Sequence, residues 1–260
     1  MRIVRFSYKK KENWGLLKNN TIEVLKAAPF SGIKKTKIKL AFEKVRLLSP
    51  AVPSKIVLVG LNYRKHAREL KMKISKEPAI FIKPPTSVIG PEEKIIYPRG
   101  VTRLDYEAEL AVVIKKKAKN IPPAEASRYI LGYTCLNDVT ARKLQKKDIQ
   151  WTRAKSFDTF CPIGPWIETN LKPGALRIRS YLNGKLKQDS HTSDFIFKVS
   201  YLVSFISRIM TLSPGDVIST GTPEGVGPMR VFDTVEVDIQ GIGRLKNSLI
   251  PDRKNQPAVV

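Results

Sequence analysis

The feature that most constrains the fold is the segment 105–114, in which two glutamates lead into an uninterrupted apolar run. Its sequence is Asp-Tyr-Glu-Ala-Glu-Leu-Ala-Val-Val-Ile. Aliphatic and β-branched residues in such a run favour a strand, so we predict one over 106–114. Alternate residues of a strand share a face, so Glu107 and Glu109 should point the same way, roughly 6.5–7 Å apart along the backbone. Two carboxylates beside an apolar run repel each other, and a hard divalent cation would remove that cost.

A further carboxylate follows a second apolar strand, which we predict over 131–136. The chain continues as Asn-Asp-Val-Thr-Ala-Arg at 137–142, so Asp138 lies where the strand gives way to a helix. Rigid strand ends commonly present ligands. Together with Glu107 and Glu109, this aspartate would leave open metal positions for water and substrate. The plainer alternative is two solvent-facing glutamates and an aspartate that caps the next helix.

A histidine and a glutamate form a third pattern in the segment 60–69, Gly-Leu-Asn-Tyr-Arg-Lys-His-Ala-Arg-Glu. On a helix, His66 and Glu69 are one turn apart and share a face. A carboxylate beside an imidazole orients the ring, which a general base requires. A surface ion pair on a charged helix fits the same spacing, so both interpretations stay open.

A lysine and a glycine-rich loop complete the candidate residues. Lys155 lies in the partly apolar stretch 151–157, where its charge is suited to countering an enolate or a carboxylate. Residues 219–228 form a glycine-rich loop after a strand, without the Gly-Lys-Ser/Thr ending of a phosphate loop. Backbone N–H groups of such a loop can still approach an anionic ligand.

The chain is strongly basic, with 47 Lys or Arg against 23 Asp or Glu and a formal net charge of +24. Residues 1–50 alone hold 13 Lys or Arg against 3 Asp or Glu. Such a surplus is typical of proteins that bind nucleic acids or acidic surfaces. The basic residues form short runs without interleaved aromatics, however, and no nucleic-acid module is recognisable. We therefore favour a solvated, lysine-rich surface that attracts anionic substrates over a nucleic-acid partner.

Prolines near position 50 divide the chain. Residues 1–52 consist of short predicted strands and turns, which indicate a small basic N-terminal β domain. Residues 53–250 open with the apolar strand 56–60 and form the larger part, and residues 251–260 are a polar tail. In the larger part we predict helices over 61–72, 123–131, 141–149 and 197–211, with further strands over 178–182, 216–220 and 234–239.

Two of these predictions concern particular residues. The helix over 197–211 should bury the residues that recur at helical spacing, namely Tyr201, Leu202, Phe205, Ile206 and Ile209. Asn183-Gly184 should form a hairpin turn between residues 181–182 and 185–186, because both turn positions tolerate positive φ.

We expect neither a membrane-spanning helix nor a disulfide bond. No stretch has the eighteen or so uninterrupted apolar residues of a membrane helix, and the N-terminus lacks a signal-peptide pattern, so we expect a cytoplasmic protein. Cys135 and Cys161 have apolar or aromatic surroundings and are too few for a disulfide framework. We expect both to be small buried hydrophobic residues.

Taken together, these segments resemble the fumarylacetoacetate hydrolase family. The resemblance covers about 53–249, and residues 1–50 match only as the variable N-terminal domain that such proteins often carry. It rests on six motifs in the family's order: Gly-Leu-Asn-Tyr-x-x-His-Ala-x-Glu at 60–69, Asp-Tyr-Glu-x-Glu-Leu-Ala at 105–111, Asn-Asp-Val-Thr-Ala-Arg at 137–142, Ala-Lys-Ser-Phe-Asp at 154–158, Leu-Ser-Pro-Gly-Asp at 212–216 and Thr-Gly-Thr-Pro-x-Gly-Val-Gly at 220–227.

The resemblance implies a mixed α+β, β-rich fold with a β-roll catalytic domain, and a homodimer. Its metal ligands fall on Glu107, Glu109 and Asp138, with Mg²⁺ or Mn²⁺ as the expected cofactor and Ca²⁺ as a further candidate. The catalytic residues that it implies are His66 and Glu69, which would activate water, and Lys155, which would position substrate. The substrate contacts that we carry over are Tyr63, Arg142, Gln145, Gly221 and Thr222.

The activity implied is cleavage of a C–C bond in a small anionic 2-oxo acid through a metal-stabilised enolate. Acylpyruvate hydrolysis and oxaloacetate decarboxylation are examples. The motifs are shared across the family, so an isomerase or decarboxylase of the 2-hydroxyhepta-2,4-diene-1,7-dioate type remains the alternative. A basic nucleic-acid-binding protein on the same fold is the non-enzyme alternative, and the intact carboxylate trio argues against it.

Overall fold

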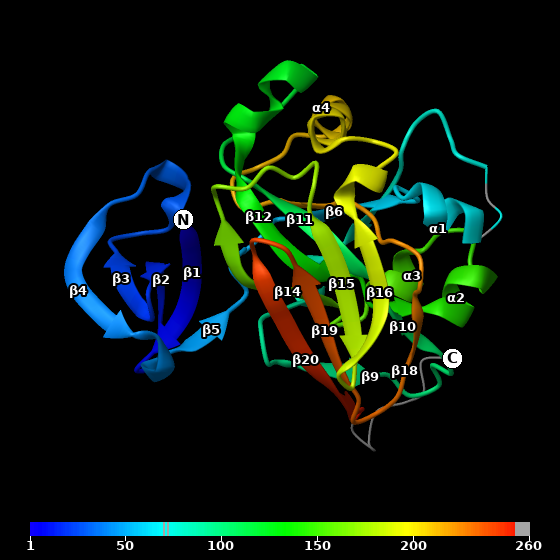
Figure 1. Cartoon of the computed structure of the whole chain (residues 1–260), viewed down its shortest axis with the longest axis horizontal. Helices are drawn as coiled ribbons and strands as arrows, with labels where there is room; N and C mark the ends of the chain where they lie inside the picture. Colours follow the sequence, from blue (N-terminus) through cyan, green and yellow to red (C-terminus); the bar gives the residue numbers. More distant parts are fainter. Residues whose placement is uncertain (70, 72, 253–260) are drawn as a thin grey trace.

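A large sheet runs through the molecule (Figure 1). The computed structural model describes residues 1–69, 71 and 73–252, and in these residues the sheet has twelve strands. Its path is β4 (Lys35–Ala41), β3 (Thr21–Leu25), β2 (Lys11–Lys18), β1 (Arg2–Tyr8), β14 (Cys161–Glu168), β12 (Ile130–Asn137), β11 (Ala108–Ile114), β17 (Val217–Ser219), β6 (Ile56–Gly60) and β7 (Ala79–Lys83). Two short strands lie off this path, with β5 (Arg46–Leu48) beside β1 and β8 (Val88–Ile89) beside β14.

Two smaller sheets and short helices complete the mixed α+β, β-rich fold. The three-stranded sheet is β13 (Thr140–Ala141), β10 (Leu104–Tyr106) and β18 (Gly227–Met229). The five-stranded sheet is β16 (Lys185–His191), β15 (Arg177–Leu182), β19 (Thr234–Ile239), β20 (Gly243–Pro251) and β9 (Lys94–Tyr97). The α-helices are α1 (Arg64–Glu69), α2 (Arg142–Lys147), α3 (Thr152–Lys155) and α4 (Val199–Ile209), and the 3₁₀ helices are η1 (Pro29–Ser31), η2 (Phe42–Lys44), η3 (Pro85–Ser87), η4 (Pro123–Tyr129) and η5 (Thr192–Asp194).

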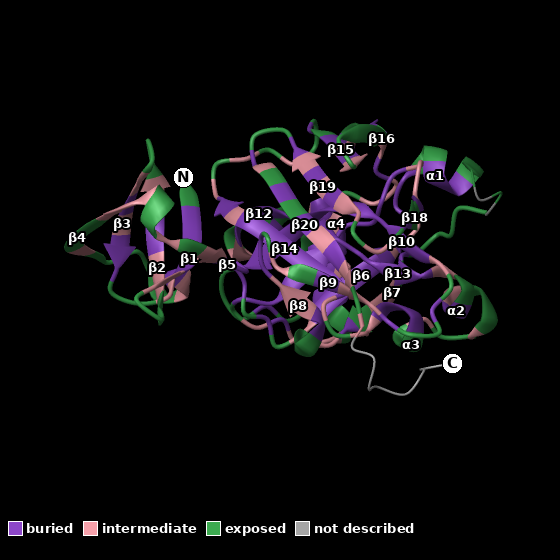
Figure 2. Ribbon diagram, turned by 90° about the horizontal axis from the view of Figure 1, so that it is seen from below, coloured by how far each residue is buried: buried purple, intermediate pink, exposed green. Residues whose placement is uncertain are grey.

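Strand β11 is buried along its whole length. It belongs to the larger part of the chain, whose interior strands are drawn mostly as buried in Figure 2. Leu110 and Val112 pack with residues of α4 and the five-stranded sheet. Ala111 and Val113 pack on the opposite face with residues of β6 and β14. A strand covered on both faces needs an apolar run rather than an alternating pattern, which explains the composition of this segment.

The predicted single strand over 106–114 is wrong at one residue, Glu107, where the chain passes from one sheet to another. Residues before it pair with β13 and β18, whereas residues after it pair with β12 and β17. Side-chain amides accept the two backbone N–H groups at the crossing. Asn137 Oδ1 accepts from Glu107 at 3.0 Å, and Gln188 Oε1 accepts from Ala108 at 3.0 Å. The break therefore leaves neither N–H unsatisfied.

Several other local predictions are confirmed or corrected. The strands over 56–60 and 234–239 are confirmed, and Asn183 and Gly184 form the predicted turn with φ of 51° and 74°. The helix predicted over 123–131 is wrong, because residues 123–129 form 3₁₀ helix η4 and β12 begins at Ile130. The helix over 61–72 is shorter than predicted, since Leu61 has a φ of 57°. Leu70 and Met72 lie outside the described residues.

Helix α4 buries a somewhat different face from the predicted one. Leu202 and Ile206 are buried as expected, together with Val199 and Val203. Ile209 is 52% exposed, which contradicts the prediction, because the helix ends at this residue and its side chain projects beyond the core. The aromatic residues Phe197, Tyr201 and Phe205 are half-buried and stack along the outer side of the helix, with ring centroids 5.7 and 6.0 Å apart.

The N-terminal strands continue the large sheet, since Arg2 pairs with Glu168 and Ile3 with Ile167. They also have a small core of their own, formed by Val4, Phe6, Ile22 and Val24. The division at residues 52 and 53 stays a prediction, and most of the predicted 251–260 tail lies outside the described residues. Within the part of the chain that is described, no helix is long and apolar enough to cross a membrane.

A pair of substitutions tests the packing of α4. Ile206→Ala should lower the free energy of unfolding by about 2–5 kcal/mol, because it opens a cavity in the core. Ile209→Ala on the same helix should cost no more than about 0.5–1 kcal/mol, since that side chain is half exposed. Urea denaturation of both variants measures the difference, and equal losses would contradict the packing described here.

Candidate active site and metal centre

A cavity of about 420 Å³ lies where the large and the three-stranded sheets meet. Strands β6, β7, β10 and β11, the three short helices α1, α2 and α3, and the loops after β12 and β17 contribute residues to its lining. One part of the lining is apolar and consists of Val59, Leu61, Phe81, Trp151 and Val226. The remainder is mainly charged or polar, so the cavity can hold a small ligand with an anionic end and an apolar end.

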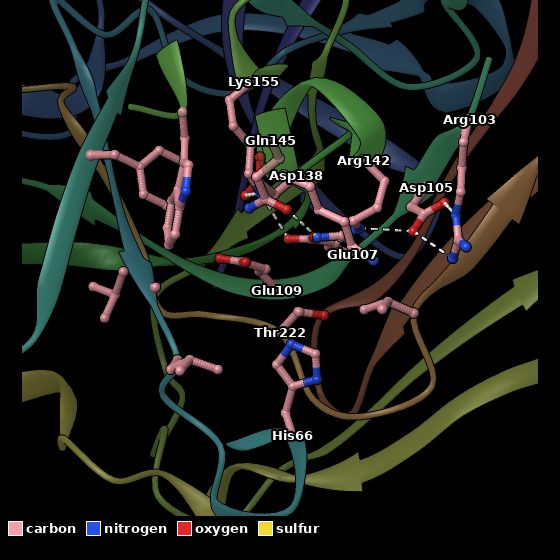
Figure 3. A pocket seen from close by; sticks show the side chains of 17 residues that line it. His66, Arg103, Asp105, Glu107, Glu109, Asp138, Arg142, Gln145, Lys155 and Thr222 are labelled. Carbon is pink, nitrogen blue, oxygen red and sulfur yellow. Dashed lines mark hydrogen bonds and ion pairs between the residues drawn. The ribbon is translucent and has the colours of Figure 1, made fainter. Parts of the chain in front are cut away.

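The side chains of Glu107, Glu109 and Asp138 converge in this cavity (Figure 3). One oxygen from each carboxylate lies within 4.8 Å of the other two, and the residues are 5%, 2% and 1% exposed. The backbone N–H of Asp138 donates to the carbonyl of Glu107 at 2.9 Å, which ties the end of β12 to the start of β11. The structure therefore brings the three predicted metal ligands together.

Three cations from separate elements neutralise part of this acidic cluster. Lys155 Nζ lies 2.9 Å from Glu107 Oε2 and 2.5 Å from Asp138 Oδ2. Arg142 forms an ion pair with Glu107 and also donates to Asp105 and Gln145 at 2.9 and 2.6 Å.

The third cation is Lys83, which is fully buried at the end of β7. It forms an ion pair with Asp138 and donates to the carbonyls of Val139 and Phe160 at 3.1 and 2.6 Å. Sequence reasoning missed this residue. The available signal was a lysine at the end of the apolar run 79–82, where a strand enters the core.

The cations do not act equally on the carboxylates. Burial alone would raise the pKa of Glu107, but Lys155 and Arg142 outweigh it and hold that pKa well below its usual range. Among the residues that the structure describes, none forms an ion pair with Glu109. Burial, followed by the charges of Asp138 and Glu107, raises the pKa of Glu109 to about 8, although the Ser219 hydroxyl donates to Oε2 at 2.5 Å and the Gly221 N–H at 2.9 Å.

This donor set fits a hard divalent cation. The three carboxylates supply only oxygen ligands, which Mg²⁺, Mn²⁺ and Ca²⁺ prefer. The raised pKa of Glu109 indicates that the cluster lacks positive charge beside this residue. A divalent ion bound by Glu107, Glu109 and Asp138 would provide that charge.

One member of the predicted histidine–glutamate pair, His66, lines the same cavity. His66 Nδ1 lies 2.9 Å from Glu69 Oε2, and His66 is only 6% exposed. His66 lies across the cavity from Lys155, with the carboxylates between them (Figure 3). The pair is therefore placed at the site rather than elsewhere on the surface.

The predicted substrate contacts divide into two groups. Arg142, Gln145 and Thr222 line the cavity, and the Gly221 N–H is bonded to Glu109 as described above. Tyr63 is elsewhere: it is fully buried in the core with its ring against Phe195, and its hydroxyl has no hydrogen-bond partner among the residues described. The structure thus does not bring Tyr63 to the cavity.

Comparison with known proteins agrees with this geometry. Residues 55–250 match the family described as fumarylacetoacetate (FAA) hydrolase C-terminal, and residues 1–50 match the one described as Rv2993c-like, N-terminal. An oxaloacetate tautomerase of Xenopus laevis, fahd2, described as mitochondrial, is 41% identical over 224 residues, which cover 81% of this chain and 70% of that protein.

Two solved structures are similar over almost the whole chain. A 5-carboxymethyl-2-hydroxymuconate delta-isomerase from Mycobacterium smegmatis is 41% identical with a TM-score of 0.92, covering 97% of this chain and 100% of that one. A maleylpyruvate hydrolase from Sphingobium, solved with manganese(II) and pyruvate, is 26% identical with a TM-score of 0.81 and the same coverage. The chain belongs to the fumarylacetoacetate hydrolase family.

Proposed function

We propose that this protein is a divalent-metal-dependent enzyme that forms the enolate of a small 2-oxo acid and cleaves its C3–C4 bond. The observation that carries the proposal is the convergence of Glu107, Glu109 and Asp138 in one buried cluster. Lys155 lies on one side of this cluster and His66 on the other (Figure 3), and Glu69 is hydrogen-bonded to His66.

Glu107, Glu109 and Asp138 would hold the metal, with Mg²⁺ or Mn²⁺ preferred and Ca²⁺ as a further candidate. When bound, the ion supplies Lewis acidity to the carboxylate and 2-oxo group of the substrate. The Sphingobium relative with manganese(II) and pyruvate supports this choice of metal and of substrate class.

Lys155 supplies a fixed positive charge. Burial alone would lower its pKa, but Asp138 and Glu107 outweigh that effect and raise the pKa above its usual value. Lys155 is therefore protonated at neutral pH and can stabilise negative charge that develops on the substrate oxygen. Arg142, Gln145, Gly221 and Thr222 are proposed to position the anionic end of the substrate.

In hydrolysis, His66 would take a proton from a water that attacks the C4 carbonyl. Glu69 holds the ring through Nδ1, which leaves Nε2 for this proton. The C3–C4 bond then breaks: C4 leaves as a carboxylic acid, the electron pair of the bond forms the enolate, and the proton taken up by His66 returns to C3 to complete the 2-oxo acid product. In decarboxylation C4 leaves as CO₂, and no water attacks.

Isomerisation is the second candidate, and two of the relatives support it. The Xenopus laevis and Mycobacterium smegmatis proteins are both 41% identical to this chain, and their names describe a tautomerase and an isomerase. A proton shift through the same enol needs no C–C cleavage.

Assays of acetylpyruvate, fumarylpyruvate, oxaloacetate and 2-hydroxyhepta-2,4-diene-1,7-dioate with Mg²⁺ would distinguish the two reactions. Turnover of the dienedioate or of enol-oxaloacetate, without cleavage of any acylpyruvate, would reject the hydrolase.

Metal affinity should depend on pH. Because the pKa of Glu109 is raised to about 8, a proton competes with the metal below that pH, and apparent affinity should fall by up to about tenfold per pH unit. Calorimetric titration with Mg²⁺ or Mn²⁺ between pH 6 and 9 measures this. Glu109→Gln should weaken binding and flatten the pH dependence, whereas Glu43→Gln, at an exposed position, should change neither.

Chelation should remove activity, and added Mg²⁺ or Mn²⁺ should restore it. Full turnover in excess chelator would reject the metal-dependent mechanism. Metal affinity that stays constant between pH 6 and 9 would instead contradict the role given to Glu109.

The two catalytic groups should be separable by mutation. His66→Ala should lower acylpyruvate hydrolysis by about 10²–10⁴-fold and affect oxaloacetate decarboxylation less, because only hydrolysis needs an activated water. Lys155→Ala should depress both reactions together. His191→Ala replaces the only other histidine and serves as the control. Unchanged hydrolysis in His66→Ala would show that the pair is not catalytic.

We also propose that the protein is a homodimer. Membership of the family motivates this, and the three stacked aromatic rings along α4 offer apolar surface of the kind that dimers bury. Light scattering at micromolar concentration should give twice the chain mass of 29.3 kDa. A monomer mass under these conditions would contradict the proposal.

A further inference from the structure

Two buried side chains, Gln188 and Tyr106, hold the glycine-rich loop 219–228 beside the cavity. Gln188 is fully buried on β16, and its Nε2 donates to Thr222 Oγ1 at 2.8 Å and to the Pro223 carbonyl at 2.9 Å. The same side chain accepts the Ala108 N–H through Oε1. The first half of the loop is thus attached to the strand that carries the metal ligands.

The second half of the loop is held by Tyr106. Its hydroxyl donates to the Gly225 carbonyl at 3.1 Å. The residue is 3% exposed and lies outside the cavity lining described above. Burial, followed by the charges of Asp105 and Glu69, raises the pKa of Tyr106 to about 12, so the hydroxyl keeps its proton and remains a donor at neutral pH.

The residue that Tyr106 holds, Gly225, also contacts the His66–Glu69 pair through its other backbone group. The Gly225 N–H donates to Glu69 Oε1 at 3.3 Å, while Glu69 Oε2 is bonded to His66. Gly225 has a φ of 90°, and a Cβ there would lie 2.6 Å from the Lys187 carbonyl, so this conformation requires glycine. One chain of hydrogen bonds therefore runs from Tyr106 through Gly225 and Glu69 to His66.

We propose that Tyr106 is a positioning residue that sets the orientation of the His66–Glu69 pair relative to the metal ligands. Tyr106 directly precedes Glu107, so any shift of that strand moves both the ligand and the anchor of the loop. The loop contacts Glu69 of the short helix α1 through the Gly225 N–H, so the position of the loop affects the position of Glu69. The inference rests on the proposed function for the catalytic role of His66, but the geometry of the hydrogen-bond chain does not depend on it.

Tyr106→Phe removes only the hydroxyl and is the test. Release of Gly225 should let Glu69 and His66 reorient, and kcat for acylpyruvate hydrolysis should fall by about threefold to tenfold, the worth of one hydrogen bond. KM and the dissociation constant for Mg²⁺ should stay within about twofold, because the ligands and cations are untouched. Tyr133→Phe is the matched control: it is a buried tyrosine with its pKa also raised to about 12, but it lies on β12 and its hydroxyl has no hydrogen bond to the glycine-rich loop.

Two further measurements separate positioning from a general loss of structure. In a His66→Ala background, Tyr106→Phe should cause no further loss of kcat, because the residue acts through His66. The chain has only two histidines, so ¹⁵N-labelled histidine gives a simple NMR spectrum. The ring signals of His66 should shift in Tyr106→Phe and stay in place in Tyr133→Phe, while those of His191 should not move in either.

The outcomes are distinct. Unchanged His66 signals in Tyr106→Phe would overturn the proposal, as would an equal loss of kcat with and without His66. Shifted signals with unchanged hydrolysis, in a protein where His66→Ala is impaired, would also overturn it. If His66→Ala itself retains full activity, the proposed water activation has failed, and the histidine spectrum alone still decides whether Tyr106 positions the pair.

Discussion

The structure depends on one buried cluster in which carboxylates and lysines of opposite charge must lie close together. The side chains of Glu107, Glu109 and Asp138 are almost fully buried. An unpaired charge in such surroundings destabilises the folded state. Lys83 and Lys155 balance part of the charge and are themselves buried. Removing one member of a buried pair typically costs about 3–5 kcal/mol, because the partner remains uncompensated. The fold must therefore hold β7, β11, β12, α2 and α3 in one arrangement, although these elements are spread over 79–155.

The passage of the chain between two sheets at Glu107 makes this convergence feasible. A continuous strand would place Glu107 and Glu109 on one face of one sheet, whereas the crossing places Glu107 at the junction of two sheets. Its cost would be two unpaired backbone N–H groups, and Asn137 and Gln188 accept both. Gln188 also holds the glycine-rich loop, so one buried amide joins the strand that carries Glu109 to the loop that contacts the His66–Glu69 pair.

The parts of the site that could be predicted are those encoded by local spacing. The aspartate at a strand end and the i, i+3 pair of His66 and Glu69 follow from regular geometry. The i, i+2 spacing also predicted that the two glutamates would share one site, although the strand is broken at Glu107. The parts of the site that could not be predicted depend on contacts with residues far away in the sequence. The strand break at Glu107 depends on which sheets accept each half, and Gln188 lies in β16, a strand without apolar alternation. Lys83 resembles a surface lysine until the fold places Asp138 beside it.

The groups proposed to stabilise the enolate and the His66–Glu69 pair are held by different parts of the fold. The groups that would stabilise an enolate, namely the carboxylates and Lys155, are fixed by buried strands and ion pairs. The His66–Glu69 pair belongs to the six-residue helix α1, which contacts the glycine-rich loop through Gly225. Hydrolysis, decarboxylation and isomerisation share the first set and differ in what reaches the enolate from the side of the second. Under the proposed function, changes in α1 or in the loop would alter this second set while the buried cluster remains the same.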